Sequence, residues 1–285
     1  MKHKHLWTGV ALVAVGLALG GGIWHVHQEK AAAAKYVNNQ TTTFFFHGWG
    51  SSSHAEEHMA NAAKRAGATD TIIKANVDKH GKTTISGKIT KKSKNPIVEV
   101  NFADNKNGDY EQDGRYAKSA IQTVSKKFGI KKMNLVGHSM GNLAIVFYLL
   151  QNADNHSLPT LEHHVAIAGH FDGGLGFGWN KKTKLAQDGK PFIMEKNYKK
   201  LLPLRDSYPQ SARVLNIAGD LDDGSHSDSE IPVDSAFSLK YLINNRAKSY
   251  RQVVIHGRRA QHSKLHSNKQ VDKLLIDFLW GKDNQ

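Results

Sequence analysis

Two kinds of apolar pattern alternate along the chain. Short runs rich in β-branched and aromatic residues, bounded by glycine, proline or polar residues, predict buried strands, whereas apolar residues recurring every three or four positions predict amphipathic helices. The expected strands are 41–46, 71–77, 97–102, 132–136, 164–169, 213–219 and 250–256; the expected helices are 54–66, 110–128, 143–150 and 271–280, with another after Pro232. Residues 80–88 are polar and predict turns. This alternation is typical of an α/β fold with a mostly parallel sheet and helices on both faces.

The chain begins with a basic pentapeptide, followed by 19 residues without a charge, Leu6 to Trp24. A helix of this length spans about 28 Å, enough to cross the hydrocarbon core of a bilayer. We therefore expect residues 1–35 to form a signal peptide or an N-terminal membrane anchor with its linker. The basic start predicts that the domain 36–285 is secreted or lies at the extracellular face of the cytoplasmic membrane.

The net charge of +14 and the lack of cysteine narrow the function classes. A chain without cysteine has no thiolate nucleophile, disulfide or cysteine-ligated zinc. The lysines are dispersed instead of gathered on one basic helix or interleaved with aromatic residues, which argues against nucleic-acid binding. We expect attraction to an anionic cell-wall surface instead, and a monomer.

One motif points to nucleophilic catalysis. Gly137-His138-Ser139-Met140-Gly141 lies between an expected strand and an expected helix. A serine on such a sharp turn needs glycine two positions to either side, because the backbone is strained and closely packed there. The turn exposes the hydroxyl and directs the first helical N–H groups towards the group that the serine attacks. Ser139 is therefore the candidate nucleophile.

Serine is a weak nucleophile unless an imidazole takes its proton and a carboxylate orients that imidazole. Candidate carboxylates follow the expected strand 213–219, at Asp220, Asp222, Asp223 and Asp228. Candidate imidazoles precede the last expected helix, at His262 and His266.

Four segments follow one another along the chain in this order: His47-Gly48-Trp49-Gly50, the serine motif, the acidic segment 227–233, and Ala260 to His266. Together they resemble the α/β-hydrolase fold, and more closely the Gram-positive family of cell-surface α/β hydrolases of uncharacterised function, from about Thr42 to Gly281. The resemblance implies that Ser139 attacks, His262 is the base and Asp228 the acid, with Asp220 as the alternative acid. It also implies an oxyanion hole formed by the backbone N–H groups of Trp49 and Met140.

The resemblance further implies that residues 171–210 form a small cap. Apolar residues of this segment, among them Phe171 and Leu175, are expected to bind substrate, and His266 to line the mouth of the site. We therefore expect an extracytoplasmic serine hydrolase, similar to a carboxylesterase or lipase, that acts on a small or lipid-like ester without a cofactor or metal.

Two other function classes stay open. His54-x-x-Glu57-His58 fits a zinc-hydrolase pattern, although surface residues on the first turns of a solvated helix explain it better. The second class is a non-catalytic cell-surface binding protein that keeps the fold. In addition, Asp220-Leu-Asp-Asp-Gly224 is similar to a calcium loop, but Gly224 comes one position too early for the EF-hand register.

Overall fold

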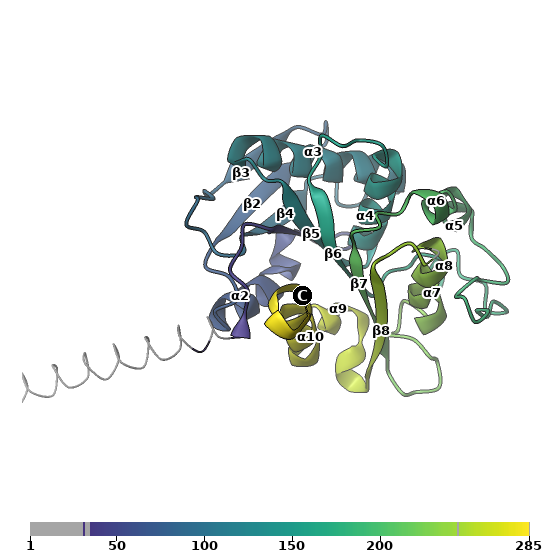
Figure 1. Cartoon of the computed structure of the whole chain (residues 1–285). Coiled ribbons are helices and arrows are strands. Elements are labelled where there is room, and N and C mark those ends of the chain that lie inside the picture. The colour runs from purple at the N-terminus through teal and green to yellow at the C-terminus, as the bar shows by residue number, and fades with distance from the viewer. Residues whose placement is uncertain (1–30, 32–34, 244, 285) are drawn as a thin grey trace, which may run out of the picture.

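The structure is a computed structural model that describes residues 31, 35–243 and 245–284. These residues form an eight-stranded sheet with the order β3-β2-β4-β1-β5-β6-β7-β8 (Figure 1). Every neighbouring pair is parallel except β2 and β3. The strands are β1 (Thr42–Phe46), β2 (Ile72–Val77), β3 (Thr83–Ser86), β4 (Ile97–Phe102), β5 (Lys132–His138), β6 (Thr160–Ile167), β7 (Arg213–Asp220) and β8 (Ser249–His256).

Helices cover both faces of the sheet (Figure 1). They are α2 (Glu57–Arg65), α3 (Tyr110–Phe128), α4 (Met140–Gln151), α5 (Lys196–Leu201), α6 (Leu204–Ser207), α7 (Val233–Phe237), α8 (Leu239–Ile243), α9 (His262–Leu265) and α10 (Lys269–Trp280), with short 3-10 turns η1 (Ser53–Ala55), η2 (Arg258–Ala260) and η3 (Lys282–Asn284).

Strand β1 shows why the sequence of a central strand can be an unbroken apolar run. Phe44 and Phe46 belong to the core that contains residues of α3 and α4. Phe45 belongs to a second core with residues of α2 and α10. Both faces of a parallel sheet are buried, which is why apolar residues follow one another from Phe44 to Phe46.

The segment 80–88 differs from the expectation of turns alone. Thr83–Ser86 forms β3, an edge strand paired with β2. Its single apolar residue, Ile85, is only partly buried. A half-exposed edge strand can pair with its neighbouring strand without an apolar run in its sequence. Strand β6 also begins four residues before the expected 164, because Thr160 to His163 continue the pairing with β5.

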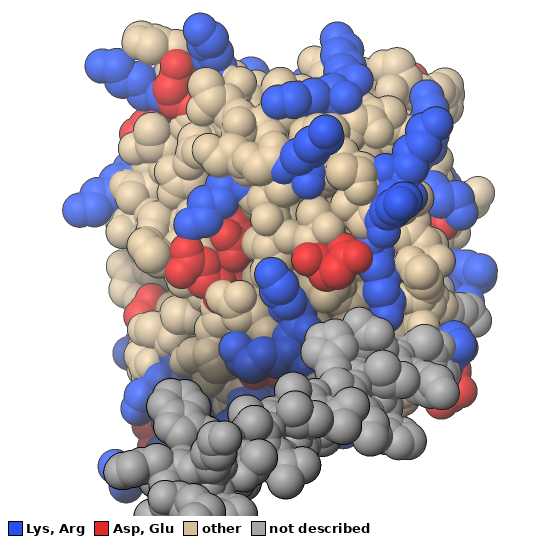
Figure 2. All heavy atoms as spheres, turned by 90° about the vertical axis from the view of Figure 1, so that its left-hand side faces the viewer, with Lys and Arg blue, Asp and Glu red and all other residues tan. Residues whose placement is uncertain are grey.

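The expected N-terminal signal or anchor, residues 1–35, lies almost entirely outside the described residues. Within the part of the chain that the structure describes, no helix is both long and apolar enough to cross a membrane. The chain enters the domain beside α10, where the N–H of Val37 donates to the carbonyl of Trp280 at 2.8 Å. On the face shown in Figure 2, lysine and arginine side chains are spread widely, with acidic groups between them.

The connection between β6 and β7 occupies the place of the expected cap. It starts with irregular chain stabilised by isolated bridges, Gly174 with Phe177 and Leu185 with Pro191, and continues into α5 and α6. The start of this connection follows the carboxyl end of β6. It therefore lies at the carboxyl ends of the parallel strands, where Ser139 follows β5.

Candidate active site

Ser139 lies on a strained turn between β5 and α4. Its backbone has φ 52° and ψ −122°, a conformation that few residues other than glycine adopt. A side chain on Gly141 would collide with the carbonyl oxygen of Phe46, and a Cβ on Gly137 would lie 2.8 Å from the N of Asn142. The two glycines therefore let β1 and α4 close on the turn that holds the serine.

A hydrogen-bonded relay joins Ser139 to His262 and Asp228. The Ser139 Oγ lies 2.9 Å from Nε2 of His262, and Nδ1 of the same ring lies 2.7 Å from Oδ2 of Asp228. An ionised carboxylate only accepts hydrogen bonds, so Nδ1 carries the proton and Nε2 is free to accept the serine hydroxyl. This tautomer is the one that a general base for Ser139 requires.

The carboxylate of Asp228 is fully buried and well satisfied. Its Oδ1 accepts the N–H groups of Glu230 at 2.9 Å and Ile231 at 2.6 Å. The backbone of Asp228 also accepts the N–H of His262 at 2.8 Å. A buried carboxylate held by several donors keeps its orientation towards one partner.

The alternative acid, Asp220, faces another direction. Its Oδ1 accepts the N–H of Asp222 at 2.9 Å, and its Oδ2 lies 3.3 Å from Nδ1 of His226. Among the interactions of the described residues, none joins Asp220 to His262. The geometry thus brings together Ser139, His262 and Asp228 and leaves Asp220 outside the relay.

The loop after β1 lies directly against Ser139. A Cβ on Gly48 would be 3.0 Å from the Cβ of Ser139. His47 fixes this loop, because its Nε2 accepts the N–H of Phe102 at 3.0 Å while its Nδ1 donates to the carbonyl of Gly48 at 2.9 Å. Burial lowers the pKa of His47, which favours this neutral form.

The two expected oxyanion donors, Trp49 and Met140, belong to segments that adjoin Ser139. Met140 is the first residue of α4, where backbone N–H groups have no partner within the helix. Trp49 follows Gly48 in the loop against Ser139, and its side chain is 53% exposed. The hydrogen bonds of the described residues include none donated by either backbone N–H.

Two residues close to Ser139, one inside the serine motif and one directly after it, make contacts that were not predicted from the sequence. Nε2 of His138 donates to the carbonyl of His262 at 3.1 Å, and burial lowers the pKa of His138 well below 6.5. Asn142 donates from Nδ2 to the carbonyl oxygens of Ser139 and Ile167. Their positions beside the nucleophile were a signal, but local spacing does not show which distant carbonyl each side chain contacts.

A second carboxylate lies near the relay. Oε2 of Glu230, which is half-exposed, lies 3.6 Å from Nε2 of His262. Burial acts to lower the pKa of His262, but the hydrogen bond and charge of Asp228, together with the charge of Glu230, outweigh it and raise that pKa above 6.5.

This arrangement predicts the pH dependence of activity. A base must be neutral to accept the Ser139 proton, so kcat/KM should fall as pH decreases through a midpoint above 6.5, the usual value for histidine. The Glu230→Gln variant removes one negative charge, so its midpoint should move to lower pH. The measurement is a pH profile of kcat/KM for both proteins.

Glu162→Gln is the matched control for this profile. Glu162 is also a partly buried carboxylate and is paired with Lys132. It lies near the amino end of β6, so it is at the opposite end of the strands from His262. Its profile should match that of the wild type. An unchanged midpoint in Glu230→Gln would show that this charge does not act on the base.

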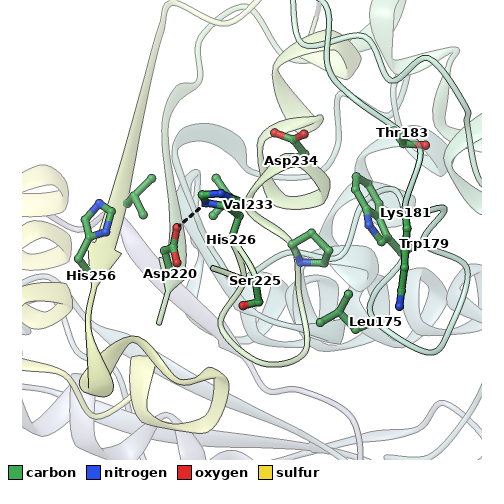
Figure 3. A pocket seen from close by; sticks show the side chains of 12 residues that line it. Leu175, Trp179, Lys181, Thr183, Asp220, Ser225, His226, Val233, Asp234 and His256 are labelled. Atoms are coloured by element: carbon green, nitrogen blue, oxygen red, sulfur yellow. Dashed lines mark hydrogen bonds and ion pairs between the residues drawn. The ribbon is translucent and has the colours of Figure 1, made fainter. Parts of the chain in front are cut away.

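Two cavities lie at this edge of the sheet. The smaller, about 160 Å³, is lined by Tyr110, Leu143, His170, Phe171, Gly173, Phe177, Gly178, Glu195 and Asn197. The larger, about 730 Å³, is shown in Figure 3 and lies between the ends of β7 and β8 and the connection that contains Leu175 and Trp179. The expected substrate residues Phe171 and Leu175 thus line different cavities.

The third expected substrate residue, His266, packs its ring on His138 at a centroid distance of 5.2 Å. It lines neither of these two cavities. The sequence analysis did not identify Tyr110 and His170, whose side chains meet at 3.2 Å in the smaller cavity. The position of His170 just after a strand at the functional edge of the sheet was the available signal.

The residues of the zinc-hydrolase pattern do not converge on one point. Nδ1 of His54 contacts Glu57 at 2.8 Å, whereas Nε2 of His58 contacts Asp272 of α10 at 2.9 Å. A catalytic zinc site needs three protein ligands around one ion. In the described ranges, the one cluster with suitable ligand spacing lies elsewhere, at Asp220, Asp222 and His256.

Comparisons with known proteins agree with this fold. A model of an alpha/beta hydrolase family of unknown function (DUF915) matches residues 30–282. The structure of the product of the Listeria innocua gene lin2722 has a TM-score of 0.77 and 24% identity, covering 85% of this chain and 94% of that one. A Lactobacillus plantarum protein named "putative cell surface hydrolase" has a TM-score of 0.66 and 18% identity, covering 85% and 91%.

No curated protein is significantly similar in sequence. The two solved structures show the shared fold, an eight-stranded, mostly parallel sheet of the α/β-hydrolase type. The family match extends over almost the whole domain. This chain therefore belongs to the family of alpha/beta hydrolases of unknown function.

Proposed function

We propose that this protein is a serine hydrolase that cleaves esters through an acyl-enzyme on Ser139. The observation that carries the proposal is the relay from Ser139 to His262 to the buried Asp228, with both hydrogen bonds below 3 Å. An active-site fluorophosphonate probe tests it directly, because such probes react with an activated serine. Neither a zinc hydrolase nor a binding protein accounts for this relay.

In the proposed reaction, the Ser139 oxygen attacks the ester carbonyl while His262 takes the hydroxyl proton at Nε2. The carbonyl oxygen becomes negative and accepts hydrogen bonds from the N–H groups of Trp49 and Met140. The tetrahedral intermediate collapses, and His262 gives its proton to the departing alkoxide. Water then repeats these steps on the acyl-enzyme, which releases the carboxylic acid and restores Ser139.

The smaller cavity is the proposed acyl site. Leu143, on α4, lies about one helical turn after Ser139. Burial, followed by the charge of His262, lowers the pKa of His170 to about 3. His170 is therefore neutral, and burial raises the pKa of Tyr110 to about 12, so that its hydroxyl is protonated. With Phe171 and Phe177 opposite, most of the wall is uncharged and suits an acyl chain.

The volume of this cavity limits the length of that chain. The cavity, at about 160 Å³, is well below the ~300–1,000 Å³ of a typical ligand pocket, which favours a short acyl chain. We expect p-nitrophenyl acetate and butyrate to be hydrolysed with a kcat/KM at least about tenfold above that of the octanoate. Steady-state kinetics with an ester series measures this.

Phe177→Ala extends the test to the cavity wall. Phe177 packs edge-on against His170 at 5.4 Å, so its removal should enlarge the cavity and shift the preference to longer chains. Phe192→Ala is the matched control, because Phe192 belongs to the same connection, is 70% exposed and does not line the cavity. Equal rates for all chain lengths, or the same profile in Phe177→Ala, would contradict the acyl site.

We further propose an extracytoplasmic location. The uncharged segment Leu6 to Trp24 after a basic start supports it, as does the name of the Lactobacillus plantarum protein. Protease digestion of intact cells should remove the domain if it is anchored outside, and the culture medium should contain it if it is secreted. Protection from protease together with absence from the medium would contradict this location.

A further inference from the structure

A group of metal-binding side chains lies at the carboxyl ends of β7 and β8, and the proposed ester hydrolysis does not use it. Asp220 and His256 are the last residues of these strands and are partners in register. Asp222 follows two residues later, and its carboxylate lies 2.8 Å from Nδ1 of His256. One ligand atom from each of the three residues lies within 4.8 Å of the other two.

The spacing of these atoms is close to that around a bound ion. Ligand atoms about 2.0–2.2 Å from one zinc ion lie roughly 3.4 Å apart, so the three side chains need only small movements. His226 offers a further imidazole, because its Nδ1 lies 3.3 Å from Oδ2 of Asp220 (Figure 3). Asp220, His226 and His256 also line the 730 Å³ cavity, which leaves room for water as a remaining ligand.

Among the ion pairs of the described residues, the carboxylates of Asp220 and Asp222 both pair with histidine. Asp220 is mostly buried, and its ion-pair partner is His226, while the partner of Asp222 is His256. Each carboxylate is thus paired with an imidazole, and carboxylate and imidazole are both side chains that coordinate zinc.

The geometry points to a divalent-cation site formed by Asp220, Asp222 and His256, with His226 in reach, that accepts zinc or a similar borderline ion. The donor set decides the class of ion, since calcium prefers oxygen ligands alone whereas zinc accepts imidazole and carboxylate together. This differs from the calcium loop that Asp220 to Gly224 resembles in sequence. It also differs from the expectation that the protein holds no metal.

The position of the site indicates what the ion does. Asp220 and Asp222 begin the loop that carries Asp228, and this loop is closed by hydrogen bonds from Leu221 to Ser227 and from Val233 to His226. An ion that ties the start of the loop to β8 would stabilise the segment that presents Asp228 to His262. Its role is structural, and binding should not depend on Ser139.

Zinc binding to the full-length protein in detergent, after removal of metals with EDTA, tests the inference. The chain contains 17 histidines, so the result is the difference between the wild type and variants measured in parallel. Calorimetric titration with ZnCl₂ should show one site in the wild type that is weakened at least about tenfold in Asp222→Asn and in His256→Gln. Zinc should also raise the Tm of the wild type by several degrees, and EDTA should reverse this.

His54→Gln is the matched control, because His54 also pairs with an exposed carboxylate at 2.8 Å but lies on another part of the fold. It should keep the zinc response, and so should Ser139→Ala, which separates this inference from the proposed hydrolase activity. The inference is overturned if both ligand variants bind zinc as the wild type does, or if calcium and not zinc raises the Tm. Asp222→Asn and His256→Gln are separate tests, so the inference stays testable if one of the two variants does not fold.

Discussion

Ser139→Ala is expected to lose all labelling by a fluorophosphonate probe and to reduce kcat for a short-chain p-nitrophenyl ester by roughly 10⁴- to 10⁶-fold. The reason is that no other hydroxyl occupies the strained turn 2.9 Å from Nε2 of His262. The residual rate would come from binding and from the oxyanion donors alone. Gel-based labelling and steady-state kinetics of the two purified proteins provide the measurement.

A second serine serves as the matched control. Ser235 is fully buried and hydrogen-bonded, donating to the carbonyl of Gly173, but it has no histidine partner among the described interactions. Ser235→Ala should therefore keep probe labelling. Labelling that persists in Ser139→Ala would show that another residue is the nucleophile and would remove the basis of the proposed function.

Asp228→Asn is expected to lower kcat by about 10⁴-fold with little change in the fold. An amide can donate to Nδ1 of His262, which would leave the ring proton on Nε2, where it blocks acceptance of the Ser139 proton. The variant should also lose the acid limb that His262 produces in the pH profile. Kinetics and circular dichroism together separate this effect from unfolding.

Asp220→Asn is the decisive comparison, because sequence alone leaves Asp220 as an alternative acid. In the structure its carboxylate faces His226 and the N–H of Asp222. We expect kcat to stay within about tenfold of the wild type, since the relay through Asp228 is intact. A larger loss in Asp220→Asn than in Asp228→Asn would mean that the acid has been assigned incorrectly.

The nucleophile turn could be predicted because its requirements are local. Strand, serine, flanking glycines and helix all lie within about 20 residues, and each residue constrains its near neighbours. The same holds for the Phe44 to Phe46 run, whose unbroken apolar character already implies burial on both faces. The fold class followed from such segments, and the family match agrees with it.

Other features of the molecule could not be predicted from the sequence, because they depend on the tertiary path of the chain. Phe171 and Leu175 are four residues apart, yet the turn between them directs one into the smaller cavity and the other into the larger. Strand β3 was missed because an edge strand, paired on one side only, carries little apolar signal. The cluster at Asp220, Asp222 and His256 was also hidden, because β7 and β8 bring together residues that lie 36 positions apart in the chain, counting from Asp220 to His256.

By itself, the sequence determined where a serine nucleophile would lie and that the surrounding chain forms a layered α/β domain, because both are encoded by contacts between near neighbours. The tertiary structure decided which carboxylate faces which histidine. Ser139 and His262 are 123 positions apart, and Asp228 lies 34 positions before His262. Only the packing of the loops at the carboxyl ends of the strands sets the distances between these side chains. A hydrogen bond tolerates errors of a few tenths of an ångström, and spacing in the chain does not determine the path of a loop to that accuracy.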